Sequence, residues 1–153
     1  MRKLILLLLT LSALGCSQQI GLFTIDIDKN FQTEKEIIQY LHNGEIRYLY
    51  DWDSERSSLD KWQTPEETQA LSTGDCDDFC VFYMYLMDKY LNIKPSIQLV
   101  IVNGMLHCWC IIDNQVHCPL SGIIEGEKSL PFYVVIYTKS YDEVFKGEMN
   151  GTI

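Results

Sequence analysis

A cysteine at the start of a predicted helix and a histidine on a predicted strand are the residues of this chain best suited to chemistry. Cys76 follows Asp75 in the run Ser72-Thr73-Gly74-Asp75-Cys76-Asp77-Asp78-Phe79-Cys80, and aspartate is a preferred helix N-cap. A helix N-terminus presents unpaired N–H groups and a partial positive charge, which lower the pKa of a thiol. His107, in Leu106-His107-Cys108-Trp109, can take the thiol proton, so the pair predicts a nucleophilic thiol.

The plainer alternative is that Cys76 is a small buried residue and His107 an ordinary strand residue, because free cysteine is among the most buried residue types. Asp77 and Asp78 stabilise the first helical turn but oppose a thiolate. We therefore expect only a modest lowering of the Cys76 pKa, unless His107 is charged beside it.

Capping boxes and hydrophobic periodicity predict the helices that position these residues. Thr33-Glu34-Lys35-Glu36 opens a helix that ends at Asn43-Gly44. Thr64-Pro65-Glu66-Glu67 opens a short helix that ends near residues 72–74. The central helix runs from Asp75 to about Leu91, and its helical spacing of apolar residues places Cys76 on the apolar face.

The second half of the chain predicts an antiparallel sheet. Residues 96–102 and 105–112 pair across Asn103-Gly104, a strong hairpin signal. Asp113-Asn114 turns the chain into residues 115–118, and a further strand covers residues 131–138 before a short helix capped by Ser140. Helices followed by an antiparallel sheet predict the α+β class.

Side chains alternate along the strand 105–112. His107, Trp109 and Ile111 share one face, and the other face carries Leu106, Cys108, Cys110 and Ile112. We expect His107 to face the helix that carries Cys76, with Trp109 lining the site and the two cysteines packed behind the sheet.

The segment Gly74 to Phe79, followed by an apolar helix and by His107-Cys108-Trp109, resembles the transglutaminase-like superfamily. That superfamily includes transglutaminases, bacterial transglutaminase-like cysteine peptidases and related thiol amidases, and the likeness covers about residues 48–119. It implies a papain-like α+β fold, in which the central helix bearing the nucleophile Cys76 packs on an antiparallel sheet bearing the base His107. It also implies that Gln63 or Trp62 lies near the oxyanion, beside the Cys76 backbone N–H. The alternative for Trp62 is packing beneath the helix.

In the superfamily that this chain resembles, an Asp or Asn on the next strand, often just before a proline, orients the imidazole. Here the residue before Pro119 is Cys118, preceded by His117. A tight turn at 113–114 puts Cys118 diagonally across from His107 on the same face, whereas a one-residue slip puts His117 there. The third member is therefore Cys118 or His117, or a backbone carbonyl orients the imidazole, or the site is a Cys–His dyad.

A zinc site is a further alternative, but no Cys-x-x-Cys spacing is present and the histidines need not share a face with the cysteines. We expect no metal and no cofactor. The residues that invite the zinc hypothesis are His107, Cys108, Cys110, His117 and Cys118.

The first residues are typical of an export signal. Arg2 and Lys3 precede an apolar run that is shorter than the about 20 residues needed to span a bilayer. Gly15-Cys16 resembles a bacterial lipobox, although Ala13 and Leu14 depart from its commonest form. We expect residues 1–15 to be a lipoprotein signal peptide, Cys16 to be lipidated, residues 16–30 to form a tether and residues 31–153 to form one transglutaminase-like domain.

Five cysteines remain besides Cys16, and an odd number leaves at least one thiol free in an oxidising compartment. Cys76 as the free thiol fits that parity, and the pairing of the others is open. The formal net charge of −9 argues against nucleic acid or an anionic membrane as a charge-driven partner.

These features predict thiol-dependent amide chemistry on a peptide or protein substrate, through a Cys–His thioester, in the bacterial cell envelope. Hydrolysis and acyl transfer both fit, and we favour hydrolysis because a wet site admits water. The alternative is a catalytically degenerate binding module anchored to the envelope, since the usual acid is absent. Oligomeric state is left open.

Overall fold

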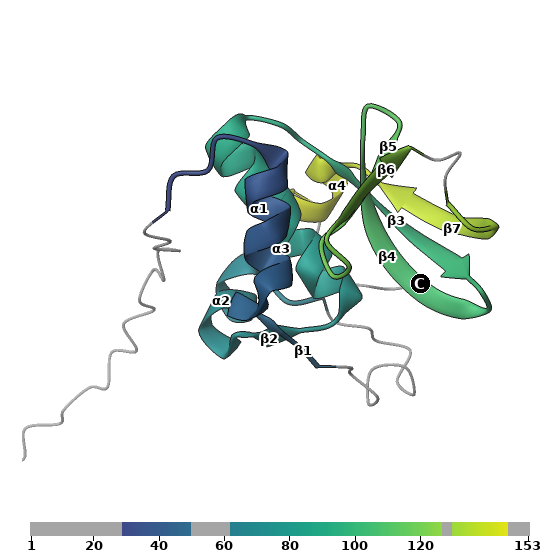
Figure 1. Ribbon diagram of the computed structural model, residues 1–153, viewed down its shortest axis with the longest axis horizontal. Helices are drawn as coiled ribbons and strands as arrows, with labels where there is room; N and C mark the ends of the chain where they lie inside the picture. The colour runs from purple at the N-terminus through teal and green to yellow at the C-terminus, as the bar shows by residue number, and fades with distance from the viewer. Residues whose placement is uncertain (1–28, 50–61, 127–129, 147–153) are drawn as a thin grey trace, which may run out of the picture.

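The computed structural model describes residues 29–49, 62–126 and 130–146. The predicted signal peptide, Cys16 and the tether up to residue 28 lie outside the described residues. In the described part, helices gather on one side and an antiparallel sheet lies on the other (Figure 1), which confirms the predicted α+β class. None of the described helices is long and apolar enough to cross a membrane.

The helices begin where the sequence predicts. Thr33, Thr64 and Ser140 each close a capping box, in which the side chain accepts a hydrogen bond from the backbone three residues on. The first helix continues into a π-helical turn that contains Gly44 at a φ of 91°, a value that glycine adopts without strain. The helices are α1 (Glu34–Tyr40), the π-helical η1 (Leu41–Glu45), α2 (Pro65–Leu71), α3 (Cys76–Leu91) and α4 (Tyr141–Phe145).

The described strands form two sheets. A two-stranded parallel sheet joins β1 (Arg47–Tyr48) to β2 (Thr73–Gly74), directly before the start of α3. The larger, antiparallel sheet has the order β6-β5-β4-β3-β7. Its strands are β3 (Ser96–Val102), β4 (Met105–Ile112), β5 (Gln115–Cys118), β6 (Ile123–Gly126) and β7 (Tyr133–Lys139).

The register of the larger sheet agrees with the predicted turns. Val102 pairs with Met105 across the Asn103-Gly104 hairpin, and Ile112 pairs with Gln115 across the next turn. The pairing of β5 with β4 covers only Cys110 to Ile112. The edge of β4 that precedes Cys110 is therefore not paired to β5.

Helix α3 is buried on most of its surface, because α1 and α2 pack on one side of it and β4 on the other. Each large apolar side chain buried there stabilises the fold by about 1.5–3 kcal/mol. This packing holds the first turn of α3 against the sheet. The buried apolar residues of α3 are Phe79, Cys80, Val81, Phe82, Tyr83, Met84, Leu86 and Met87.

The face of β4 that packs against α3 is the opposite of the one predicted. Cys108 and Cys110 pack against α3, where the Cys110 thiol donates a hydrogen bond to the Cys80 carbonyl at 3.7 Å. Trp109 lies on the opposite face, and strand alternation places His107 there as well. The prediction that the two cysteines pack behind the sheet was wrong, because β4 is apolar on both faces and both faces are buried. Trp109 forms a second cluster with Val100, Val116 and Cys118.

Candidate functional site

Cys76 is the first residue of α3 and is half-buried. The carboxylate of Asp78 holds the chain around it: Oδ2 accepts a hydrogen bond from Asp75 N–H at 3.1 Å, and Oδ1 accepts one from Gln63 N–H at 2.7 Å. This buried carboxylate ties the segment before α2 to the first turn of α3. It fixes the direction in which Cys76 leaves the helix.

Gly74 is needed because the Asp78 side chain folds back over it. A Cβ added at Gly74 would lie 2.7 Å from Asp78 Cβ, closer than packed carbon atoms approach. We expect Gly74→Ala to lower the free energy of unfolding in urea by about 1–3 kcal/mol and to slow alkylation of Cys76. Gly126→Ala is the matched control, because a Cβ there meets nothing within 4 Å. Equal stability of the two variants would contradict this account of the Gly-Asp-Cys segment.

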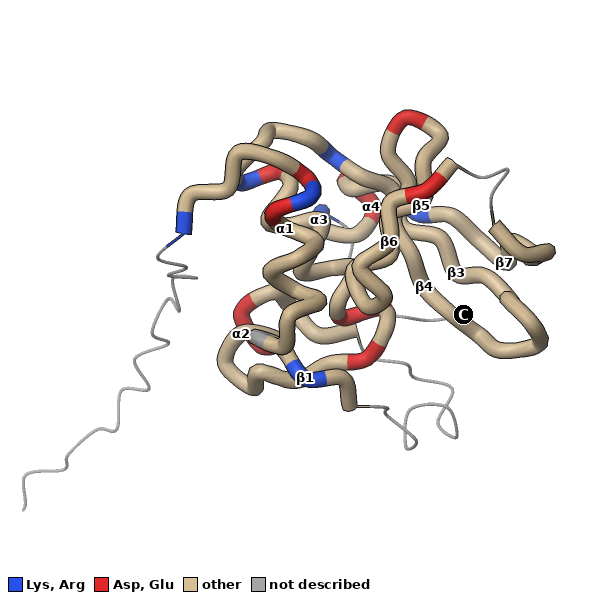
Figure 2. Tube along the Cα trace, in the orientation of Figure 1, with Lys and Arg blue, Asp and Glu red and all other residues tan. Residues whose placement is uncertain are grey.

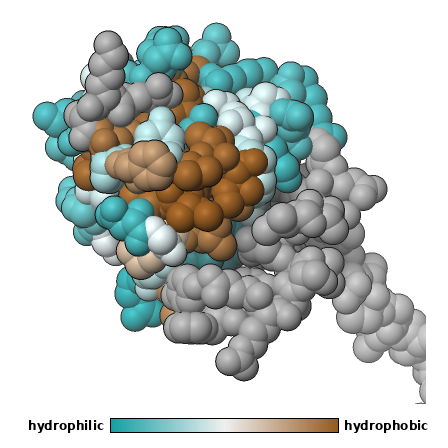
Figure 3. Space-filling model, turned by 90° about the vertical axis from the view of Figure 1, so that its right-hand side faces the viewer, coloured by the Kyte–Doolittle hydropathy of each residue, from teal (hydrophilic) through white to brown (hydrophobic). Residues whose placement is uncertain are grey.

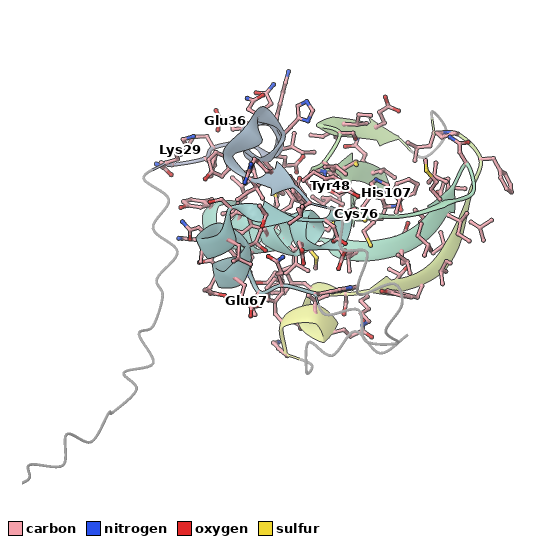
Figure 4. All side chains as sticks on the ribbon, turned by 90° about the horizontal axis from the view of Figure 1, so that it is seen from below. Lys29, Glu36, Tyr48, Glu67, Cys76 and His107 are labelled. Atoms are coloured by element: carbon pink, nitrogen blue, oxygen red, sulfur yellow. The ribbon has the colours of Figure 1, made fainter. Side chains whose placement is uncertain are left out.

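The imidazole of His107 lies between two thiols. Its Nε2 is 3.2 Å from Cys118 Sγ, and it also hydrogen-bonds Cys76. Burial lowers the pKa of His107, but hydrogen bonding with Cys118 and Cys76 outweighs it and raises the pKa to about 10. His107 is therefore an imidazolium at neutral pH. Nε2 is the ring nitrogen that meets Cys118, and Figure 4 shows His107 beside Cys76.

The pKa of Cys76 is lowered to about 5. A hydrogen bond from the Cys108 thiol is the largest cause, burial opposes it, and the hydrogen bond and charge of His107 add to the lowering. The nearby Asp75 charge raises the pKa. A modest lowering was expected unless His107 is charged, and the charged imidazole makes the shift large.

Cys76 reaches two neighbouring residues of β4 whose side chains point to opposite faces. Cys108 faces α3, whereas His107 points to the other side of the sheet. Among the described residues, β5 pairs with β4 only from Cys110 onwards, so the first turn of α3 can approach the part of β4 that precedes Cys110.

Cys118 stands where the diagonal register predicts. It is buried, and burial raises its pKa, but hydrogen bonding and the charge of His107 give a net lowering. Cys76 and Cys118 thus lie beside the same imidazolium, which favours the thiolate form of each. The structure brings Cys118, and not His117, to the imidazole.

His117 lies on the other face of β5, paired with Cys110. It is fully buried, and its Nδ1 is 2.7 Å from the Tyr83 hydroxyl. Its Nε2 has no hydrogen-bond partner among the described residues. Burial lowers the pKa of His117 to about 4, although the charge of Asp113 partly opposes it. His117 is therefore a neutral core residue, remote from His107.

The lowered pKa of His117 predicts acid sensitivity. The unfolded chain binds a proton near pH 6.5 and the folded chain only near pH 4, so stability falls as pH falls through this interval. We expect a loss of about 2–3 kcal/mol between pH 7 and pH 4.5, read from urea denaturation. His117→Gln should remove this part of the pH dependence. An unchanged slope in that variant would place the acid sensitivity elsewhere.

The remaining predicted site residues are Trp62, Gln63 and Trp109, and the two tryptophans make packing contacts. The Trp62 ring stacks on Tyr137 at 6.4 Å between centroids and lies under Lys139, which favours packing over an oxyanion contact. Gln63 lies beside the start of α3, and its side-chain oxygen is buried without a partner among the described residues. The Trp109 N–H donates a hydrogen bond to Gln98, and its ring meets His107 edge-on at 6.2 Å.

The residues of the zinc hypothesis are divided between the two faces of the sheet. His107 and Cys118 lie on one face of the sheet, and Cys108, Cys110 and His117 lie on the other. Among the described residues, the ligand atoms of Asp75, Cys76 and Asp77 are the ones that lie within 4.8 Å of one another. The five described cysteines are all free.

Two features of the site were missed by sequence reasoning. Cys108 was assigned to the far face, and Tyr48 was not among the predicted site residues. Tyr48 and the hairpin residues 102–107, which include His107, line a cavity of about 630 Å³. The sequence signal for this surface was the apolar pair Met105 and Leu106 on a predicted strand. In the structure both side chains are exposed.

Neither a model of any protein family nor any curated protein sequence matches this chain.

Proposed function

We propose that this chain is a transglutaminase-like thiol enzyme that acts on an amide bond of a peptide or protein. The observation that carries the proposal is the single imidazole of His107, held between the thiol at the start of α3 and the thiol before Pro119. These are the positions where the resembling superfamily places its nucleophile and its orienting residue. The packing of α3 on β4 supports a papain-like arrangement for the domain, residues 31–153.

The proposed reaction begins from a Cys76 thiolate and a His107 imidazolium. The thiolate attacks the amide carbonyl, and the backbone N–H of Cys76, unpaired within the helix, stabilises the oxyanion. The imidazolium then gives its proton to the amine nitrogen as the C–N bond breaks, which leaves a thioester on Cys76. In the second half, neutral His107 takes a proton from water or an acceptor amine that attacks the thioester. The C–S bond then breaks, the Cys76 thiolate leaves beside the reformed His107 imidazolium, and the product is an acid or a new amide.

Hydrolysis is the form of the reaction that the site favours. Cys76 is half-buried, and the neighbouring cavity opens at residues that are largely exposed. Water therefore reaches the thioester without movement of a described element. An amine competes with water only where a second binding surface holds it near His107.

The acyl-enzyme is the direct test. The full-length protein is incubated with p-nitrophenyl acetate, and we expect a burst of nitrophenolate and the mass of one acetyl group on Cys76. Neutral hydroxylamine should remove that group, because thioesters react with it rapidly. Cys76→Ala should show no burst, and Cys80→Ala, which changes a buried thiol further along α3, should retain it. A folded protein that is never acylated at Cys76 would contradict the proposal.

A second candidate is the catalytically degenerate binding module, favoured by the absence of a carboxylate at position 118. It predicts a stable fold with an unreactive Cys76. The acetylation experiment separates the two, because a binding module forms no thioester.

We also propose that the protein is exported and anchored by lipid on Cys16. The expected result is a mature chain that partitions with detergent and carries acyl chains on Cys16. Cys16→Ser should release the protein or leave it unprocessed, and Ser17→Ala should change neither. A mature chain that begins elsewhere and stays in the aqueous phase would contradict lipidation, and export would remain open.

A further inference from the structure

The cavity beside His107 is a groove along the first residues of β4. Tyr48 of β1 forms one wall, and residues 102–107 of the β3–β4 hairpin form the other. Figure 4 shows Tyr48 beside Cys76 and His107. We propose that this groove binds the amine side of the substrate, as an extended peptide segment with apolar side chains. The inference rests on the proposed function and adds the class of substrate.

The direction of the substrate follows from the role of His107. The imidazolium must donate its proton to the leaving nitrogen, so that nitrogen lies against the ring. The residues that follow the nitrogen continue along the wall of which His107 is a part. That wall runs through Leu106 and Met105 towards the hairpin turn, so the groove holds the amine side of the amide.

The apolar character follows from the lining. Leu106 and Met105 are 52% and 69% exposed, and Tyr48 is 46% exposed. No Lys, Arg, Asp or Glu occurs between residues 96 and 112, in a chain whose formal net charge is −9 (Figure 2). Among the described lining residues the imidazolium is therefore the one charge, and we expect a neutral occupant beside it.

The apolar surface extends beyond the groove. Figure 3 shows a broad hydrophobic area on the side of the molecule where the β3–β4 hairpin and β7 lie. Soluble proteins rarely leave such an area uncovered unless it binds something. Its continuity with the groove favours a peptide or protein chain over a small amide. The exposed apolar residues on these strands are Ile101, Met105, Leu106, Val134, Val135 and Ile136.

The extended form follows from the shape of the groove. Six consecutive residues line one wall, so the wall includes a strand edge as well as side chains. Within the described residues, β5 does not pair with this part of β4. Such an edge can add an extended peptide as a further strand. The volume of about 630 Å³ lies within the range of pockets that bury a whole ligand.

The test observes the groove without turnover. The full-length Cys76→Ala protein is labelled with carbon-13 at its methionine methyl groups and titrated with three probes. The titration is made at about pH 9, where an α-amine, whose ordinary pKa is about 8, is mostly neutral. Phe-Leu amide then represents an apolar amine product, acetyl-Phe-Leu an apolar acid product, and Asp-Glu amide a charged amine product. We expect Phe-Leu amide to shift the Met105 methyl resonance saturably, while the buried Met84 and Met87 stay unchanged. The other two probes should bind at least about tenfold more weakly.

Matched variants locate the binding. Leu106→Asp should weaken the binding of Phe-Leu amide at least about tenfold. Ile123→Asp changes an exposed apolar residue of β6, outside the groove, and should leave the affinity unchanged. The proposal is overturned if Met105 does not respond, if acetyl-Phe-Leu or Asp-Glu amide binds equally well, or if both variants bind alike.

The outcome is separable from that of the proposed function. Peptide binding at Met105 with an unreactive Cys76 would support the peptide-binding groove and contradict the proposed enzyme. Acetylation of Cys76 without a Met105 response would support the enzyme and contradict the groove.

Discussion

At pH 6, His107→Gln should slow the alkylation of Cys76 by iodoacetamide about a hundredfold. The pKa of Cys76 is about 5, so the wild-type thiol is mostly thiolate at this pH. Removing His107 removes a hydrogen bond and a positive charge that hold the pKa down. The pKa then returns towards its ordinary value of 9.0, and the Cys108 hydrogen bond limits that return.

The same argument predicts how the alkylation rate depends on pH. A thiol with a depressed pKa is a thiolate above that pKa, so the wild-type rate should rise around pH 5 and then stay level. The pKa of His107 is raised to about 10, so the imidazolium keeps its proton over the plateau of the profile and loses it only as the pH approaches about 10. Cys76, His107 and Cys118 interact with one another, so a proton lost from one changes the pKa of the others. The two pKa values therefore describe the interacting groups as a whole rather than single residues.

The control for this experiment is His42→Gln. His42 lies on η1, where its Nδ1 is 3.0 Å from the Leu120 carbonyl oxygen, away from the cavity lining. This variant should keep the wild-type profile. A wild-type rate that rises only near pH 9, or equal profiles for both histidine variants, would show that His107 does not activate Cys76.

Replacing Cys118 should change turnover in a direction that depends on the new side chain. Cys118→Ala removes the group that orients the imidazole and should lower the turnover of p-nitrophenyl acetate about ten- to a hundredfold. Cys118→Asp restores a carboxylate beside Nε2 and should raise turnover. Loss of the carboxylate charge in a serine-protease triad costs about 10⁴ in turnover, which sets the upper limit of the gain.

Cys118 is buried in the cluster with Val100, Trp109 and Val116, so a new carboxylate could disturb the packing. Cys118→Asn therefore accompanies Cys118→Asp, because it offers an acceptor of similar size without the charge. Folding of each variant is checked by thermal denaturation. If the folded Asp and Asn variants and Cys118→Ala all turn over at the wild-type rate, then the imidazole is oriented by another group.

Local sequence patterns determined most of the elements around the candidate site. The boxes at Thr33, Thr64 and Ser140 set three helix starts, and Asp75 marks the start of α3. The Asn103-Gly104 turn set the register of β3 and β4. These features depend on residues close together in the chain, so they could be predicted. The diagonal placement of Cys118 followed from the next tight turn by the same logic.

Two short strands and one strand pairing were not predicted from the sequence. β2 has two residues, too few to show an alternating pattern, and its pairing with β1 had no local signal. β6 was not predicted either. The pairing of β7 with β3 joins segments more than thirty residues apart, and no turn between them sets a register. Their placement depends on the surfaces left open by the rest of the fold.

The sequence by itself determined that Cys76 begins a helix, that His107 lies on a strand, and that Cys118 can meet His107. Only the tertiary structure decided which face of β4 meets α3. Alternation defines two faces, but both faces of β4 are apolar, so burial alone does not choose between them. Packing placed Cys108 and Cys110 against α3, and the open edge of β4 let Cys76 reach both Cys108 and His107. The largest contribution to the lowered Cys76 pKa therefore comes from the Cys108 thiol, which the sequence prediction had placed on the face away from α3.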